Sequence, residues 1–556
     1  MTVAPPRHVE ADGAPVPPDD GDHGRGTRAW FSPHVVVPVV IGLVFVAIVI
    51  PGLAVRSPLG HDEAVYMLRG RDLLTGWSHY SGGYWSDFRA PGLPLIISGL
   101  GQVIGVHVTS SRLLVVMLAM VIMAATAVIG ARLASRSVGL LAAALLPLTY
   151  GFSLTATTVL ADTPGAAFAL VAVAIYLRDV ELGRLRLSFA AVPLLAFAST
   201  LSRFGAPFML GAGLLGVAVI AAPEVLRRRN WTLVVQSAVL AVAVAAVVAL
   251  VVMTDIFTLY GRSPLAANST LVERNDFTLR TGLADLIEVI NPWEDRPGLL
   301  WSKAVLVIVV VGLLAAVVSV YFCRSRWRVV TFGLLAGIVS LGCVVASVGQ
   351  IVPNYLMLTL PYWILVAAAG WEWVGRLALT GLRDHMVIRR IVVIAVAVGL
   401  VALAADAGSE VRESHLRFER SSGRIREASI VTGDLLGDSC VLIARYTPQA
   451  GFYSGCRIDR FWGFDQPDAS ASLGRSVDTV IERWGLGVPP EAPIAVMLVE
   501  QATRQPDLTA LTDQPDLFGE RIYESGTPGR PRDHIIVETV DPCVSDRSCA
   551  SFEPSD

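Results

Sequence analysis

The sequence feature that most constrains this chain is a series of uncharged stretches about as long as a lipid bilayer is thick. A helix needs about 20 apolar residues to cross roughly 30 Å of hydrocarbon. Hydrophobic residues make up 53% of the chain and charged residues 16%, which is typical of a polytopic membrane protein. The sequence therefore predicts about eleven membrane-spanning helices, at 31–55, 113–131, 138–161, 163–177, 187–202, 204–223, 231–254, 304–323, 329–348, 355–371 and 391–405.

One further apolar stretch, "PGLPLIISGLGQVIGVH" at 91–107, decides the orientation of the others. Its core is too short to cross a bilayer comfortably, so we expect a helix along the membrane surface. With that assignment, all arginine clusters fall on one side of the membrane, which the positive-inside rule makes cytoplasmic. The N-terminus is then inside, whereas the loops 56–112 and 255–303 and everything after 405 lie outside.

Composition divides the chain into three parts. Residues 1–30 are rich in Pro, Gly and Asp and predict a disordered cytoplasmic tail, not a signal peptide, because the following apolar core is too long. Residues 31–405 form the membrane domain. Residues 406–556 contain short β-branched runs such as "CVLIARY", "APIAVMLVE" and "DHIIVETV", which predict a small soluble α/β domain outside the plasma membrane.

Four of the six cysteines fall in this external domain. An even number in an oxidising compartment favours two disulfides, most simply Cys440 with Cys456 and Cys543 with Cys549. Free buried thiols are the alternative.

Carboxylates occur where the predicted loops meet the external membrane surface. Asp62 and Glu63, followed by Tyr66, lie in "HDEAVY", and Asp162 lies in "VLADTPGAAF" before a predicted span. An acidic pair in a loop is often only solvated surface, and Asp162 before Thr163 and Pro164 is also well suited to cap a helix. These structural interpretations are compatible with a functional one.

Arginines gather at the same predicted face. Arg89 lies in "DFRAPGLPL" and Arg203 in "STLSRFGAPF". A single interfacial arginine often only anchors a helix end, and for Arg203 alone that is the simpler interpretation. Several guanidinium groups near an acidic pair instead favour an anionic headgroup, because guanidinium binds phosphate through paired hydrogen bonds. The net charge of −3 gives no indication of nucleic-acid binding.

Together, "DEAVY", the "RAP" segment, "ADTPGAAF" and "NYLMLTLPYWILVAAAG" resemble motifs of the GT-C glycosyltransferases over roughly residues 31–405. Similar families are the protein O-mannosyltransferases and the bacterial transferases of 4-amino-4-deoxy-arabinose to lipid A. The resemblance implies that Asp62 is catalytic and that substrate contacts come from Glu63, Tyr66, Arg89, Asp162 and Tyr355. Arg203 is added as a substrate contact because it is an arginine at the same predicted face. Asn354 stands where relatives often have arginine, which is a departure from the family pattern.

The function implied by the resemblance is inverting transfer of a sugar from a polyprenyl-phosphate donor to an extracytoplasmic protein, lipid or cell-envelope glycan. Asp62 would be the general base. No cofactor is expected; the sequence has no HExxH-type metal spacing, and a divalent metal remains an open alternative. A transporter is disfavoured because the predicted spans lack ionisable residues. A membrane-anchored binding or assembly protein that works through its C-terminal domain remains the alternative function.

Overall fold

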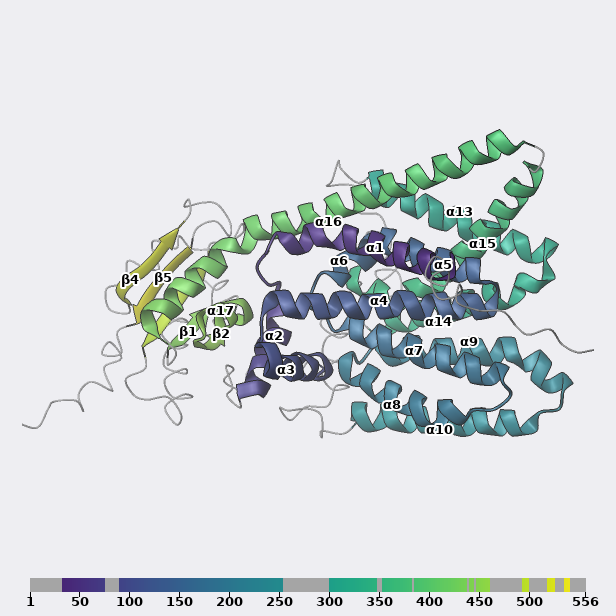
Figure 1. The fold of residues 1–556 in the computed structure, drawn as a ribbon. Helices are drawn as coiled ribbons and strands as arrows, with labels where there is room; N and C mark the ends of the chain where they lie inside the picture. Colours follow the sequence, from purple (N-terminus) through teal and green to yellow (C-terminus); the bar gives the residue numbers. More distant parts are fainter. Residues whose placement is uncertain are drawn as a thin grey trace, which may run out of the picture.

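A computed structural model describes residues 33–75, 90–253, 300–347, 353–382, 385–437, 440–444, 447–460, 493–499, 518–525 and 535–540. Long helices run side by side and a small sheet lies beyond one end of them (Figure 1). The bundle contains α1 (Pro33–Ala54), α4 (Val108–Leu133), α5 (Arg136–Leu145), α6 (Tyr150–Ala156), α7 (Asp162–Glu181), α8 (Arg186–Ser202), α9 (Ala206–Arg227), α10 (Trp231–Met253), α13 (Leu300–Phe322), α14 (Trp327–Ser347), α15 (Leu360–Gly381) and α16 (Met386–Leu436).

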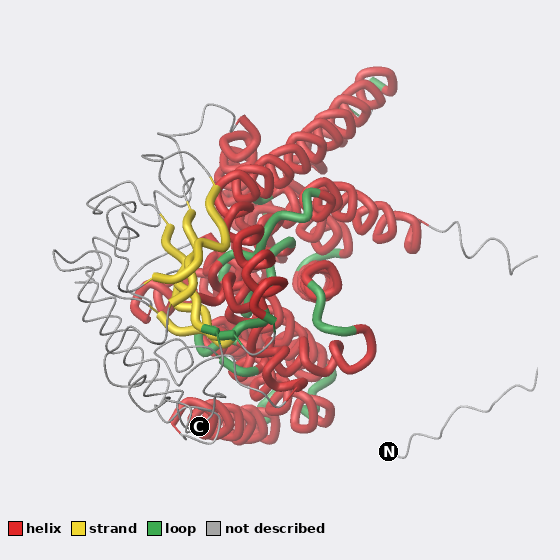
Figure 2. Tube along the Cα trace, turned by 90° about the vertical axis from the view of Figure 1, so that its left-hand side faces the viewer, coloured by secondary structure: helices red, strands yellow, loops and turns green. Residues whose placement is uncertain are grey.

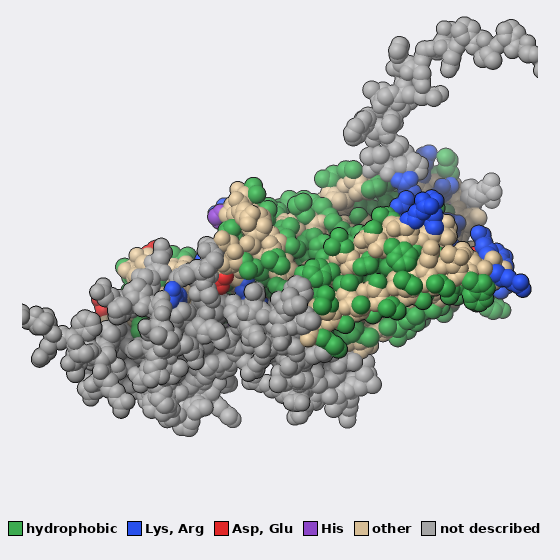
Figure 3. All heavy atoms as spheres, turned by 90° about the horizontal axis from the view of Figure 1, so that it is seen from below, with side chains coloured by type: hydrophobic (Ala, Val, Ile, Leu, Met, Phe, Trp, Pro, Cys, Tyr) green, Lys and Arg blue, Asp and Glu red, His purple; other side chains and the backbone are tan. Residues whose placement is uncertain are grey.

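Among the described residues, eight helices are long and apolar enough to cross a membrane, so the chain is a multi-pass membrane protein. Apolar side chains cover the flank of the bundle, and arginines gather at the end away from the sheet (Figure 3). The eleven predicted spans fall largely on helices, but those at 138–161, 187–202 and 355–371 are not among these eight. The span 355–371 is divided between the 3-10 helix Pro353–Leu358 and α15, and 138–161 is not continuous either. It is broken into α5, the 3-10 turn Leu146–Leu148 and α6, because Pro147 cannot donate a backbone hydrogen bond.

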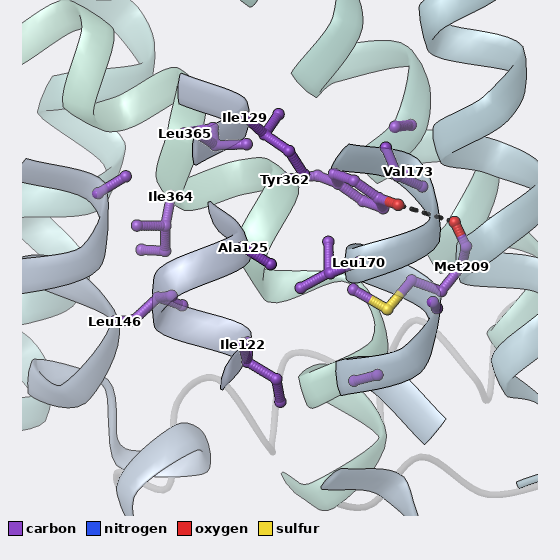
Figure 4. Close-up of a cluster of buried hydrophobic side chains, with 14 of the residues drawn as sticks. Ile122, Ala125, Ile129, Leu146, Leu170, Val173, Met209, Tyr362, Ile364 and Leu365 are labelled. Carbon is purple, nitrogen blue, oxygen red and sulfur yellow. Dashed lines mark hydrogen bonds between the residues drawn. The ribbon is translucent and has the colours of Figure 1, made fainter. Parts of the chain in front are cut away.

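The bundle is held together by a continuous hydrophobic core. Figure 4 shows part of it, where Tyr362 of α15 reaches between α7 and α9. The Tyr362 hydroxyl donates to the carbonyl of Met209 at 2.8 Å, so its buried polar atom is satisfied. Small residues let helices approach closely, since a Cβ added at Gly213 would clash with the Tyr362 hydroxyl.

Two short helices, α2 (His61–Thr75) and α3 (Gly92–Ile104), lie at the end of the bundle nearest the sheet (Figure 1). The 13 residues of α3 extend about 20 Å, which is too short for a span. That length agrees with the predicted surface helix. The two helices pack closely, since a Cβ at Gly70 would meet Ile97 at 2.6 Å.

The last long helix, α16, does not end where the composition changes. It continues for 51 residues to Leu436, and Gly437 ends it with a φ of 75°. The predicted domain boundary at 405/406 therefore lies inside a helix, because the sequence there becomes polar but contains no proline to interrupt the helix. Residues 385–402 are exposed throughout, whereas Gly408 packs against the backbone of α1. One continuous helix thus joins the membrane bundle to the C-terminal part.

The C-terminal part contains a five-stranded sheet in the order β2-β1-β3-β5-β4. Its strands, grouped together in Figure 2, are β1 (Val441–Ala444), β2 (Arg457–Arg460), β3 (Ile494–Val499), β4 (Phe518–Ser525) and β5 (Ile535–Val540). β1 is parallel to β2 and β3, whereas β5 is antiparallel to β3 and β4. The three β-branched runs in the sequence became β1, β3 and β5.

A short helix, α17 (Thr447–Ser454), connects β1 to β2. Cys440 and Cys456 flank this connection and are joined by a disulfide, with their Cα atoms 4.8 Å apart. This is the pairing that the sequence suggested. Cys543 and Cys549 lie outside the described residues.

Candidate active site at the sheet end of the bundle

The candidate site is organised around Glu63, in the first turn of α2. Its side chain is 5% exposed and forms an ion pair with Arg112, with Nη2 3.0 Å from Oε2. Arg112 Nε also donates to Oε1 at 3.2 Å, and the backbone N–H groups of Gly60 and Val159 donate to the same carboxylate. Glu63 therefore joins three segments: the beginning of α2, the second turn of α4 and the segment before α7.

This environment fixes the ionisation of Glu63. Burial by itself would raise the pKa of Glu63, but Arg112 and the backbone donors outweigh it and hold the pKa below its ordinary value. The carboxylate is thus charged at neutral pH. Sequence reasoning placed Glu63 among the substrate contacts; here its oxygens accept hydrogen bonds from the protein itself.

Arg112 is a member of the site that the sequence analysis did not identify. It is 2% exposed and donates from Nη1 to both the carbonyl and the hydroxyl of Ser57, each at 3.1 Å, and from Nη2 to the carbonyl of Pro58 at 3.3 Å. In sequence it is only the charged residue that ends an apolar stretch. Its buried position depends on where α4 meets the loop before α2.

Asp62, next to Glu63, is half-buried and lines a cavity of about 400 Å³. The cavity lies between the beginning of α2, the end of α6 and the middle of α16. Its other lining residues are Ser57, Gly60, His61, Glu63, Arg112, Leu154, Thr155, Thr158, Leu160, Asn354, Ser414, His415 and Phe418. The lining thus combines two carboxylates, several hydroxyl groups and one phenyl ring.

Asp162 anchors a second cluster beside this cavity. It is 1% exposed, Arg203 Nε lies 3.1 Å from its Oδ1, and Asn354 Nδ2 donates to its Oδ2 at 2.9 Å. Asp162 is the first residue of α7, where its negative charge interacts favourably with the positive end of the helix dipole. Asn354 also lines the cavity and thereby connects the two clusters.

Arg203 does more than anchor a helix end. Its guanidinium lies over the ring of Tyr355, 4.7 Å from the centroid. Burial opposes its charge, but Asp162, Tyr355 and Tyr66 together raise the pKa of Arg203. Tyr66 and Tyr355 are therefore brought to the same cluster from α2 and from the turn before α15, whereas Arg89 lies outside the described residues.

The C-terminal part contacts the site directly. The Arg71 guanidinium of α2 lies 4.3 Å above the ring of Phe452 in α17 and donates to the Phe452 carbonyl at 3.0 Å. The Tyr453 hydroxyl accepts from the backbone N–H of Leu59 at 2.8 Å. The disulfide-closed segment thus packs against the helix that carries Asp62.

Within the residues that the structure describes, no group of three or more His, Cys, Asp or Glu side chains is arranged to hold a metal ion.

The overall arrangement of the chain is the GT-C membrane glycosyltransferase fold. A similar solved structure is ArnT from Cupriavidus metallidurans bound to undecaprenyl phosphate, with a TM-score of 0.55 and 14% identity, covering 92% of this chain and 98% of that one. The same enzyme in its apo state gives 0.52 and 14%, over 93% and 99% of the two chains.

A third similar structure is the oligosaccharyltransferase of Archaeoglobus fulgidus tethered to an acceptor peptide that contains the NVT sequon. Its TM-score is 0.50 at 12% identity, over 90% of this chain and 74% of that one. The sequence matches no protein-family model and no curated protein significantly. At these identities the likeness establishes the fold.

Proposed function

We propose that this chain is a membrane glycosyltransferase that moves a sugar from a polyprenyl-phosphate donor to an acceptor outside the plasma membrane. The observation that carries the proposal is the position of Asp62. This residue lines a cavity that lies next to two buried carboxylate–arginine pairs. The fold supports it, because a solved protein with this fold, ArnT, is bound to undecaprenyl phosphate. The acceptor is a protein, a lipid or a cell-envelope glycan.

Asp62 is the proposed general base. Of the two carboxylates that line the cavity, Glu63 accepts four hydrogen bonds from the protein and has a lowered pKa, which makes it a poor base. Asp162 is not among the residues that line this cavity. Asp62 takes the proton of the acceptor hydroxyl while that oxygen bonds to the anomeric carbon.

The bond from the anomeric carbon to the donor phosphate oxygen breaks in the same step, with inversion. The polyprenyl phosphate leaves with the electron pair and needs little protonation, since phosphate is a good leaving group. Arg203, with its side chain 17% exposed, and Arg89 are proposed to stabilise this negative charge. The lipid tail stays in the bilayer.

The alternative function, a binding or assembly protein that works through its C-terminal domain, is less well supported. The continuous α16 contributes Ser414, His415 and Phe418 to the cavity. A C-terminal domain that acted independently of the bundle would not need these contacts.

The test is Asp62→Asn in the full chain, with transfer measured from polyprenyl-phosphate sugars. The substitution preserves shape and removes basicity, so turnover should fall by roughly 10² to 10⁴ while donor binding persists. Asp72→Asn, on the same helix but away from the lining of the cavity, is the matched control. A folded Asp62→Asn protein with near wild-type turnover would remove Asp62 from this role and make Asp162 the next candidate.

A further inference from the structure

His415 of α16 lines the cavity and is hydrogen-bonded to two segments that are distant in the sequence. It is 4% exposed, and both of its ring nitrogens have partners. Nδ1 lies 2.7 Å from the Ser57 hydroxyl and Nε2 lies 3.0 Å from the Thr157 hydroxyl. These partners are 358 and 258 positions away in the sequence, one before α2 and one at the end of α6.

The donors and acceptors in this series of hydrogen bonds determine which ring nitrogen of His415 carries the proton. Arg112 has only donors, so Ser57 Oγ accepts from Arg112 Nη1 and gives its own proton to His415 Nδ1. At the other nitrogen, the Thr157 hydroxyl donates to the carbonyl of Leu154 at 2.8 Å and so accepts from His415 Nε2. In every hydrogen bond of this series, the donor is therefore on the side of Arg112 and the acceptor on the side of Leu154.

Only the neutral ring with its proton on Nε2 satisfies every group. A protonated ring would direct a second donor at Ser57 Oγ, leave the Ser57 proton without its acceptor and place a positive charge near Arg112. The contact is also tight, because a Cβ added at Gly52 of α1 would lie 2.8 Å from Cδ2 of the His415 ring. The backbone of α1 therefore fits closely around this ring.

We propose that His415 is a positioning residue for Asp62, acting as the neutral Nε2–H tautomer through Ser57 and Arg112. Ser57 and Pro58, which both accept from Arg112, lie in the short segment that leads into the first turn of α2. A shift of this segment moves Asp62 relative to the cavity. The inference rests on the proposed function for its catalytic consequence, but the tautomer and the packing do not depend on it.

Three substitutions in the full chain separate the two hydrogen bonds. His415→Phe preserves a ring and removes both bonds, so kcat should fall about 10- to 100-fold with little change in KM, as expected for a misplaced base. His415→Asn restores an acceptor at the position of Nδ1 and should recover most of the loss. His415→Gln restores only a donor toward Thr157 and should recover less. Equal recovery by both amides would overturn the proposed route through Ser57.

A double-substitution cycle gives a second criterion. Because Ser57 and His415 belong to the same series of hydrogen bonds, Ser57→Ala combined with His415→Phe should lower kcat no further than His415→Phe alone. Additive losses would contradict the coupling. His107→Phe, a substitution at the beginning of α4 outside this network, serves as the control and should leave kcat unchanged.

Two readouts work without any glycosyl transfer, so failure of the proposed function can be told apart from failure of this inference. Nitrogen NMR of histidine-labelled protein, with the signal assigned by its loss in His415→Asn, should show protonated Nε2 and unprotonated Nδ1. Hydrogen exchange over 57–66 should rise in His415→Phe. A protonated Nδ1, or unchanged exchange in that segment, would overturn the positioning role.

Discussion

Arg112 Nη2 lies 3.0 Å from Glu63 Oε2, and 49 residues separate the two along the chain. Arg112 is in the second turn of α4 and Glu63 in the first turn of α2, so the pair joins the N-terminal parts of two helices inside the protein. Ser57 and the backbone of Val159 complete the network. Asp62 takes its place in the cavity because this network holds the residue next to it.

Breaking the pair should destabilise the fold strongly. Glu63→Gln leaves the Arg112 charge buried without a counter-ion, a change that typically costs about 3–5 kcal/mol. Thermal unfolding of the purified protein measures this loss. The matched control is Glu224→Gln, because Glu224 forms its ion pairs with Arg227 and Arg228 at an exposed helix end and should change stability little. Equal effects of the two substitutions would contradict the role given to the Glu63 pair.

The same pair predicts acid sensitivity. The pKa of Glu63 in the folded protein lies below its ordinary value of 4.5, so its contribution to stability is complete above pH 4.5. That contribution is lost as the pH falls from 4.5 through the folded value, because the unfolded chain then binds the proton more readily. Unfolding midpoints recorded across this range should fall more steeply for the wild-type protein than for Glu63→Gln. Parallel curves would argue against the lowered pKa.

Removal of the Cys440–Cys456 disulfide should loosen α17 from α2. The cross-link closes a loop with a sequence separation of 16, which corresponds to on the order of 3 kcal/mol. In a Cys440→Ala/Cys456→Ala protein, hydrogen exchange should therefore rise in 447–454 and around Arg71, which contacts Phe452. Replacing the free cysteines Cys323 and Cys343 serves as the control. Peptide mapping without reductant that finds Cys440 and Cys456 as free thiols would refute the bond itself.

Two glycines of α15 should respond to the same substitution in opposite directions. A Cβ at Gly370 would lie within 3 Å of the backbone of α13 at Gly312 and Ala316, so Gly370→Ala must push the two helices apart and destabilise the bundle. At Gly375 there is nothing within 4 Å, and Gly375→Ala should stabilise the helix by about 0.5–1 kcal/mol. Thermal unfolding distinguishes the pair. A tolerated Gly370→Ala would mean that α13 and α15 pack less closely.

The orientation in the membrane can be tested with single cysteines in a chain that lacks Cys323 and Cys343. A cysteine at Arg228, after α9, should react only with a membrane-permeant reagent, because its arginine cluster is expected to be cytoplasmic. A cysteine at Glu524, on the exposed face of β4, should react with an impermeant reagent in intact cells. The reverse pattern would place the proposed site on the cytoplasmic side and exclude the extracytoplasmic acceptor.

Local patterns in the sequence were sufficient for much of the fold. Uncharged stretches near bilayer length became helices, because a buried backbone in hydrocarbon must satisfy its own hydrogen bonds. The β-branched runs became β1, β3 and β5, and the short stretch 91–107 became the 13-residue α3. Asp62 and Asp162 were recognisable because their type and their place at the ends of apolar stretches are properties of neighbouring residues alone.

Tertiary structure decided which of these residues work together. The contacts of Glu63 with Arg112 and of Ser57 with His415 form where segments distant in the sequence pack together. The hydrophobic periodicity of the sequence does not predict which segments these are. The change of composition at 406 suggested a boundary, yet α16 continues past it because helix formation depends on backbone geometry and not on polarity. Sequence alone thus located the carboxylates, whereas the packing of helices decided that Glu63 would be held by the protein and that Asp62 would line the cavity.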